Sequence, residues 1–311
     1  MKFLTAQPDN DYSIWQLQVQ MNNFKKFGIE DSSIILFGYN SKTGINPNAL
    51  KLRDNTTSTV IFIPDDRIQS DKKYIPTIRP YLLKKFFEKY SDLVKNESWM
   101  YHDSDIIFRE IPDIDKFEEQ SNIWVSDTRS YLDSKYIKSK HPELFNKMCE
   151  IVKISPQTVE ANDSTCGGAQ YIFNKAMPLD AAFWDKVLSD SSALFKFMQK
   201  TSKVYSPDHP IQAWTADMWA VLWNLWLRKY PTQINEQLSF SWATSNIAQW
   251  EKCKIFHNAG VTEKDKHLFF KGKYIHKAPF GDDFSYVNKN TCSYKYVEEI
   301  LDTKKSLNHF S

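Results

Sequence analysis

Residues 98–108 read SWMYHDSDIIF: a short apolar run, two aspartates separated by one serine, and a second apolar run. The two runs have the length and composition of buried strands, which places Asp103 and Asp105 at a strand end. Magnesium and manganese prefer oxygen ligands, and a protein usually supplies one or two carboxylates while substrate phosphates supply the rest. The stretch therefore predicts a divalent-cation site. Two aspartates in an ordinary turn would show the same pattern.

Strands and helices are expected to alternate around this stretch. Strand-like apolar runs occur at residues 2–6, 34–37, 59–63, 98–101 and 169–173. Helical patterns occur at residues 15–27, 80–93 and 211–228. This alternation predicts an α/β fold with a mostly parallel central sheet and helices on both faces, in which ligands bind beyond the carboxyl ends of the strands.

Composition favours a single folded domain without a strong electrostatic partner. The 311 residues are 41% hydrophobic, and 40 basic against 38 acidic residues leave a net charge of +2, so no general attraction to nucleic acid or membrane follows. The four cysteines form no CxxC pair, which argues against a zinc site or a disulfide framework. The polar N-terminus and the lack of a long apolar run predict a cytoplasmic protein without membrane insertion.

A buried carboxylate is the second site candidate. Residues 212–226 are apolar nearly all round, which marks a buried helix, and Asp217 lies in the middle of that stretch. A carboxylate there must be paired, protonated or facing a polar cavity. A structural aspartate satisfied by backbone or by an arginine is the alternative. We assign most of the tryptophans, Trp214 included, to the core, and expect Trp15 and Trp242 to be the better ligand contacts.

Several blocks along the chain resemble one enzyme family in the same order. They are Thr5-Ala6 with Tyr12 and Trp15, Ile78-Arg79-Pro80-Tyr81, residues 103–109, residues 167–173, and Ala216-Asp217-Met218-Trp219. Together they resemble the GT-A type glycosyltransferases, and within these the plant and algal hydroxyproline O-arabinosyltransferases and peptidyl serine α-galactosyltransferases. The sequence departs from the family at Asp217, where relatives carry glutamate, and at Ile78, where many carry asparagine.

The resemblance implies a GT-A-like, Rossmann-type nucleotide-sugar-binding domain over residues 1–311, with a nucleotide-binding half at 1–112 and an acceptor-binding half at 113–311. It implies a metal-dependent enzyme that transfers a sugar, such as arabinose or galactose, from a UDP-sugar to an acceptor hydroxyl with retention. Mn²⁺ or Mg²⁺ would be held by Asp103, Asp105 and a late histidine, for which His257 is the first candidate and His276 the reserve.

The remaining expected site residues would contact the donor or the acceptor. Asp217 would be catalytic, either by hydrogen bonding to donor-sugar hydroxyls or by acting as a general base. Arg79, at a helix start, would contact the diphosphate. Gly167 and Gly168 would let the backbone approach the donor closely, although a plain turn would read alike. Further donor contacts are expected from Thr5, Ala6, Ser104 and Gln170.

The acceptor stays open between a glycan, a protein and hydroxymethylated cytosine in phage DNA. For DNA, phosphate contacts could come from the lysines at 25, 26, 84, 85, 135, 138 and 140, or these could be solvated faces. A non-catalytic carbohydrate-binding module is the alternative of another class. A two-metal phosphoesterase would need more clustered Asp and His ligands than the sequence offers.

Overall fold

The computed structural model describes residues 1–113, 117, 121–205 and 208–308. The chain divides into two compact units. Unit 1 consists of Met1–Lys2, Asp65–Tyr101 and Asp115–Glu236, and unit 2 consists of Phe3–Pro64, His102–Ile114 and Gln237–Ser311. Seven strands form the central sheet of a mixed α/β fold with flanking helices, which confirms the predicted fold class.

Unit 2 carries the first three strands of the sheet and the short strands near the two aspartates. Strands β1 (Lys2–Pro8), β2 (Ser33–Tyr39) and β3 (Thr59–Pro64) are parallel, with β1 beside β2 and β2 beside β3. A second, three-stranded sheet has the order β5 (Ile106–Phe108), β10 (Ile255–His257) and β9 (Phe240–Trp242). The helices of unit 2 are α1 (Asp11–Lys26), α2 (Pro47–Asp54) and α12 (Cys292–Asn308).

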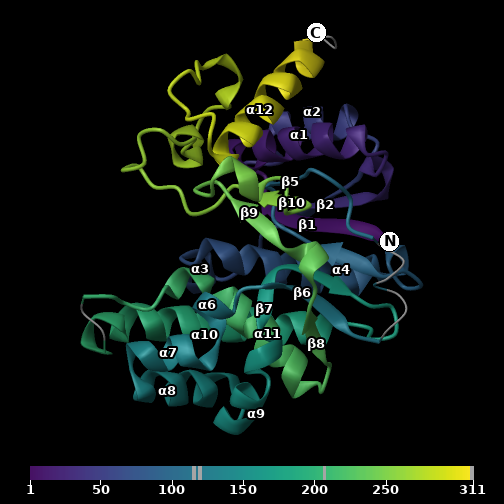
Figure 1. Cartoon of the computed structure of the whole chain (residues 1–311). Coiled ribbons are helices and arrows are strands. Elements are labelled where there is room, and N and C mark those ends of the chain that lie inside the picture. The colour runs from purple at the N-terminus through teal and green to yellow at the C-terminus, as the bar shows by residue number, and fades with distance from the viewer. Residues whose placement is uncertain (114–116, 118–120, 206–207, 309–311) are drawn as a thin grey trace. The chain divides into compact units, whose positions relative to one another are not determined.

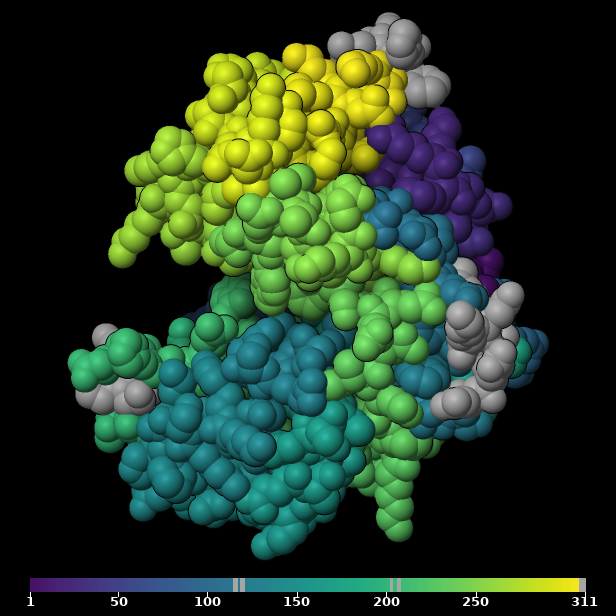
Figure 2. Space-filling view, in the orientation of Figure 1, coloured from purple at the N-terminus to yellow at the C-terminus, as the bar shows by residue number. Residues whose placement is uncertain are grey.

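The core of unit 2 is rich in aromatic side chains and includes residues of α1, near the start of the chain, and of α12, near its end. Helix α12, yellow in Figure 1, packs beside α1, purple in the same view. Helix α1 begins after Asn10, whose side chain accepts a hydrogen bond from the Ser13 amide and so satisfies one unpaired donor of the first turn. The space-filling view shows the yellow C-terminal segments of unit 2 as a continuous surface (Figure 2).

Unit 1 carries the remaining strands and most of the helices. Strands β4 (Trp99–Tyr101) and β6 (Ile123–Asp127) both run antiparallel to β7 (Gly167–Phe173), and β8 (Thr232–Ile234) is parallel to β6. The long helix α10 (Ala181–Tyr205) packs against α4 (Ile78–Lys89) and α11 (Ala216–Leu227). The shorter helices are α3 (Gln69–Lys72), α6 (Arg129–Leu132), α7 (Ser134–Lys140), α8 (Pro142–Val152) and α9 (Pro156–Ala161).

All five predicted strands and all three predicted helices are present, with shifted ends. The helix predicted at residues 15–27 begins earlier, at Asp11, and the one predicted at 80–93 ends at Lys89. The helix predicted at 211–228 begins only at Ala216, because residues 213–215 form a tighter 3-10 turn. The four cysteines are buried free thiols. Within the described ranges no helix is both long and apolar enough to cross a lipid bilayer.

Candidate metal centre

The two aspartates and His257 come from segments of unit 2 that are far apart in sequence. Asp103 and Asp105 lie between β4 and β5, and His257 is the last residue of β10. Strand β10 pairs antiparallel with β5 so that His257 lies opposite Ile106. The amide of Asn258 donates a hydrogen bond of 2.9 Å to the carbonyl of Asp105. This register places the histidine beside the turn that carries the two carboxylates.

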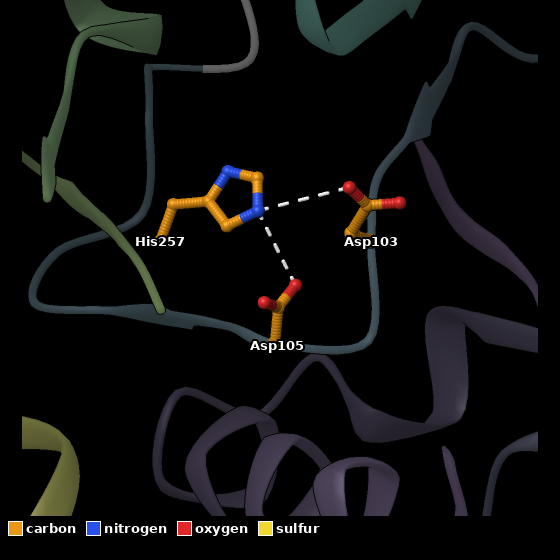
Figure 3. A group of neighbouring side chains, drawn as sticks. All are labelled: Asp103, Asp105 and His257. Atoms are coloured by element: carbon orange, nitrogen blue, oxygen red, sulfur yellow. Dashed lines mark ion pairs between the residues drawn. The ribbon is translucent and has the colours of Figure 1, made fainter. Parts of the chain in front are cut away.

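The three side chains point toward one another (Figure 3). His257 Nε2 lies 3.3 Å from Asp105 Oδ1 and 3.7 Å from Asp103 Oδ2, and one ligand atom from each residue lies within 4.8 Å of the others. Asp105 and His257 are buried, whereas the Asp103 side chain is 23% exposed. Carboxylates and imidazoles are ligands that divalent cations bind in proteins, so the three residues could hold one such ion.

A lysine that no sequence signal marked completes this cluster. The Lys271 ammonium forms an ion pair with Asp105 Oδ2, the carboxylate oxygen that does not face His257. Burial opposes ionisation of Asp105, but the charges of Lys271 and His257 outweigh it and hold the pKa of this carboxyl well below its usual value. Asp105 is therefore ionised at neutral pH. Lys271 begins a 3-10 turn in a lysine-rich stretch, where one lysine does not stand out in the sequence.

Helix α1 and strand β1 hold the segment that carries the two aspartates by hydrogen bonds. Gln20 Nε2 donates to the Asp103 carbonyl at 2.9 Å, and the His102 amide donates to the Leu4 carbonyl at 3.2 Å. Burial lowers the pKa of His102 to about 4, so its ring is neutral near pH 7. The predicted donor contacts Thr5 and Ala6 are buried in β1, and Ser104, between the aspartates, is 5% exposed.

The two tryptophans expected to contact a ligand, Trp242 and Trp15, lie in different surroundings. Trp242, an expected ligand contact, stacks parallel to the His257 ring, with centroids 6.2 Å apart and planes inclined by 6°. Trp15, the other expected contact, is wrongly placed by sequence reasoning: it is 1% exposed, and its indole N–H donates to the Tyr274 carbonyl. Polar Ser13 and Gln16 lie near Trp15 in sequence, but Ile14 directly precedes it and its own side chain belongs to the aromatic core. His276, the reserve ligand, is exposed and outside the cluster.

A second carboxylate site lies in unit 1, where the structure brings Asp217 and Arg79 together. Asp217, in the first turn of α11, is 7% exposed. The Tyr74 hydroxyl donates to Asp217 Oδ1 at 2.8 Å, and Arg79 Nε lies 3.5 Å from Asp217 Oδ2. Burial and the nearby charge of Asp217 raise the pKa of Tyr74 well above its usual value, so the hydroxyl stays protonated. Sequence reasoning did not identify Tyr74.

The glycine-led segment begins β7 at an irregularity of the sheet. Gly167 and Gly168 pair with Asp127 and Ser126, and the register shifts between Val125 and Ser126. A Cβ on Gly168 would lie 2.8 Å from the Tyr171 hydroxyl and 3.0 Å from Met218 Cε, so neighbouring side chains approach this backbone closely. Gln170 is fully buried and accepts a hydrogen bond from Ser126 Oγ at 2.6 Å.

The comparisons with known proteins concern the fold. No family model matches the sequence, and no curated protein does. Among solved structures, the bifunctional glycosyltransferase WbbM, in its apo form, matches 100% of this chain at 9% sequence identity with a TM-score of 0.51. The chain has the GT-A glycosyltransferase fold. It spans 51% of the length of WbbM. The match to the galactosyltransferase LgtC, bound to donor and acceptor sugar analogues, covers 98% of this chain and 96% of the LgtC chain at 12% sequence identity, with a TM-score of 0.48.

Proposed function

We propose that this protein is a metal-dependent glycosyltransferase that transfers a sugar from a nucleotide-sugar to an acceptor hydroxyl. The observation that carries the proposal is the cluster of Asp103, Asp105 and His257 in a chain with a glycosyltransferase fold. We assign Mn²⁺ or Mg²⁺ to this cluster and a UDP-sugar to the donor. The sequence resemblance supports arabinose or galactose as the transferred sugar.

Each group of the cluster has a part in the proposed reaction. A cation held there would neutralise the charge that develops on the leaving diphosphate. Asp105 is kept ionised by Lys271, so it can bind a cation without first losing a proton. Lys271 also adds a positive charge beside the place where phosphates would bind. We keep Thr5, Ala6, Arg79, Ser104, Gly167, Gly168 and Gln170 as proposed donor contacts.

The surroundings of Asp217 favour a role other than proton removal. One carboxylate oxygen accepts the Tyr74 hydroxyl and the other faces the Arg79 guanidinium. Both contacts engage the carboxylate oxygens, so removal of a proton from an acceptor hydroxyl by Asp217 would first have to displace Tyr74 or Arg79. An inverting transferase needs a carboxylate base, whereas a retaining one can use the leaving phosphate. We therefore propose that Asp217 accepts hydrogen bonds from sugar hydroxyls and that the configuration is retained.

The DNA alternative draws little support from the lysines on which it depended. Four of them are held by carboxylates: Lys26 by Glu299 and Asp302, Lys84 by Asp185, Lys85 by Glu88, and Lys138 by Glu160. Paired ammonium groups neutralise phosphates less effectively than free ones, because binding must first break the pair. No observation specifically favours a phage DNA acceptor.

Thermal unfolding with nucleotides tests the proposal. UDP with Mn²⁺ should raise the melting temperature of the wild-type protein by mass action, and UDP or Mn²⁺ alone should raise it less. Asp105→Asn should abolish the joint effect. The control Asp92→Asn replaces an aspartate whose side chain is 90% exposed, and this variant should keep the joint effect of UDP and Mn²⁺. Equal melting temperatures with every nucleoside diphosphate, with or without metal, would refute the nucleotide-sugar assignment.

A further inference from the structure

Trp214 is an exposed aromatic side chain in unit 1 that the sequence pattern assigns to the core. The prediction is wrong because α11 begins at Ala216, so Trp214 lies in the preceding 3-10 turn, outside the buried helical stripe. Trp219 and Trp223, inside the helix, are fully buried, whereas Trp214 is 57% exposed. Tryptophan is enriched at interfaces because its large apolar ring also carries a polar N–H group.

Contacts with Tyr74 fix Trp214 beside Asp217. The Trp214 and Tyr74 rings meet edge to face, with centroids 5.7 Å apart and planes inclined by 88°. The Tyr74 hydroxyl contacts both the Trp214 carbonyl and the Asp217 carboxylate. Tyr74 is itself held by stacking on Phe195, with centroids 4.1 Å apart. Tyr74 thus contacts both the ring and the backbone of Trp214, and the same Tyr74 hydroxyl contacts the Asp217 carboxylate.

The chemistry around the indole suits a neutral, polyhydroxylated ligand. Its neighbours in the turn and just before it, Gln212, Ala213 and Thr215, are uncharged, and Ile75, next to Tyr74 in sequence, is 56% exposed. Arg79, the cation that faces Asp217, is paired with that carboxylate. A polyanion would require unpaired cations here. The apolar face of a sugar ring needs a flat aromatic surface, and its hydroxyls need neutral or anionic acceptors.

We propose that Trp214 is the platform on which a neutral sugar ring of an acceptor glycan stacks, next to Asp217. The assignment of this glycan as acceptor rests on the proposed glycosyltransferase function. Stacking of a sugar ring on Trp214 would favour a glycan, and not a protein or a nucleic acid, as the acceptor class.

Direct binding tests the platform independently of the reaction. Isothermal titration with neutral oligosaccharides (galactotriose, arabinotriose and xylotriose) is compared with a hydroxyproline peptide and an oligonucleotide containing hydroxymethylcytosine. At least one oligosaccharide should bind, and Trp214→Ala should weaken its affinity roughly tenfold, as expected when a ring loses its stacking partner. Trp214→Phe should keep most of the affinity. Val204→Ala, which trims another exposed apolar side chain of unit 1, should leave it unchanged.

The outcomes separate this inference from the proposed function. Equal oligosaccharide affinities of the wild type and Trp214→Ala, or no oligosaccharide binding at all, would overturn the platform. Preferred binding of the peptide or the oligonucleotide would overturn the acceptor class. Melting temperatures with UDP and Mn²⁺ should be raised equally in the wild type and all three variants. If that rise is absent while oligosaccharide binding still depends on Trp214, the transferase proposal fails and the sugar platform stands.

Discussion

At the scale of single residues, the ion pair between Lys271 and Asp105 should stabilise the folded protein when no metal is bound. Replacing Lys271 by methionine removes the cation from one oxygen of a carboxylate that is 3% exposed. Removing one partner of a buried ion pair leaves an uncompensated charge, so we expect the free energy of unfolding to fall by about 3 kcal/mol in a chelating buffer. Urea denaturation measures this loss.

Divalent metal should restore part of that stability, because a bound cation supplies the charge that Lys271 no longer provides. The loss caused by Lys271→Met should therefore be smaller with Mn²⁺ than with chelator. Lys273→Met, in the same 3-10 turn, serves as the matched control and should respond equally in both buffers. An identical loss for Lys271→Met with and without Mn²⁺ would show that the cluster does not bind the ion.

Gly167 is required by close backbone packing in β7. A Cβ at this position would lie 2.4 Å from the carbonyl oxygen of Ser126 and 2.4 Å from Val125 Cγ2. Because the oxygen belongs to the neighbouring strand, relief requires a backbone shift, and Gly167→Ala should lower the unfolding free energy by roughly 2 kcal/mol. Denaturant midpoints measure the change. Gly281→Ala, with no atom within 4 Å of the added carbon, should be close to neutral.

At the scale of secondary-structure elements, a buried polar contact joins α10 and α11. Asn224 Nδ2 donates to Asp190 Oδ2 at 2.7 Å, and Lys186 also reaches this oxygen, at 2.6 Å. Asn224 is 2% exposed and Asp190 is 7% exposed. Asn224→Leu leaves the carboxylate with one donor fewer, so we expect a loss of about 2 kcal/mol in unfolding free energy.

A double-mutant cycle isolates the contribution of this contact. Asp190→Asn and Asn224→Leu should each destabilise the protein, and the double variant should lose less than the sum of the two single losses. A coupling of about 1 kcal/mol is expected for one charge-assisted hydrogen bond. Strict additivity would mean that the Asn224–Asp190 contact contributes nothing to the stability of the protein.

At the scale of the whole molecule, the Asp65–Arg67 pair contributes to stability toward acid. Arg67 Nε and Nη2 each lie 2.9 Å from an oxygen of Asp65, and both side chains are largely buried. Burial alone would raise the pKa of Asp65, but the hydrogen bonds and charge of Arg67 lower it below its usual 3.8. The unfolded chain therefore takes up its proton at higher pH than the folded chain.

This pair should stabilise the protein above about pH 4 and lose its effect as the pH falls through the lowered pKa of the folded state. Arg67→Gln should reduce the unfolding free energy by about 2 kcal/mol near pH 7, and the difference from wild type should narrow near pH 3. Urea denaturation at both pH values measures the two differences. A difference that is the same at both would show that the ionised form of Asp65 is not preferentially stabilised.

The sequence predicts much of the fold because its strands are continuously apolar. A parallel strand that is buried on both faces reads as a nearly uninterrupted apolar run, as in β2, and the edge strand β3, although only partly buried, has the same kind of run. Helix ends were less predictable, since apolar spacing does not distinguish a 3-10 turn from the first turn of an α-helix. That ambiguity placed Trp214 in the core rather than on the surface.

By itself the sequence determined that Asp103 and Asp105 lie close together at a strand end, because only one serine separates them and short apolar runs flank the pair. His257 was selected by resemblance and by its place after an apolar run, and only the pairing of β10 with β5 brings it to the aspartates. Lys271 and Tyr74 had no local signal. Their partners, Asp105 and Asp217, lie more than a hundred residues away, and a contact over that separation is set by packing of the folded chain.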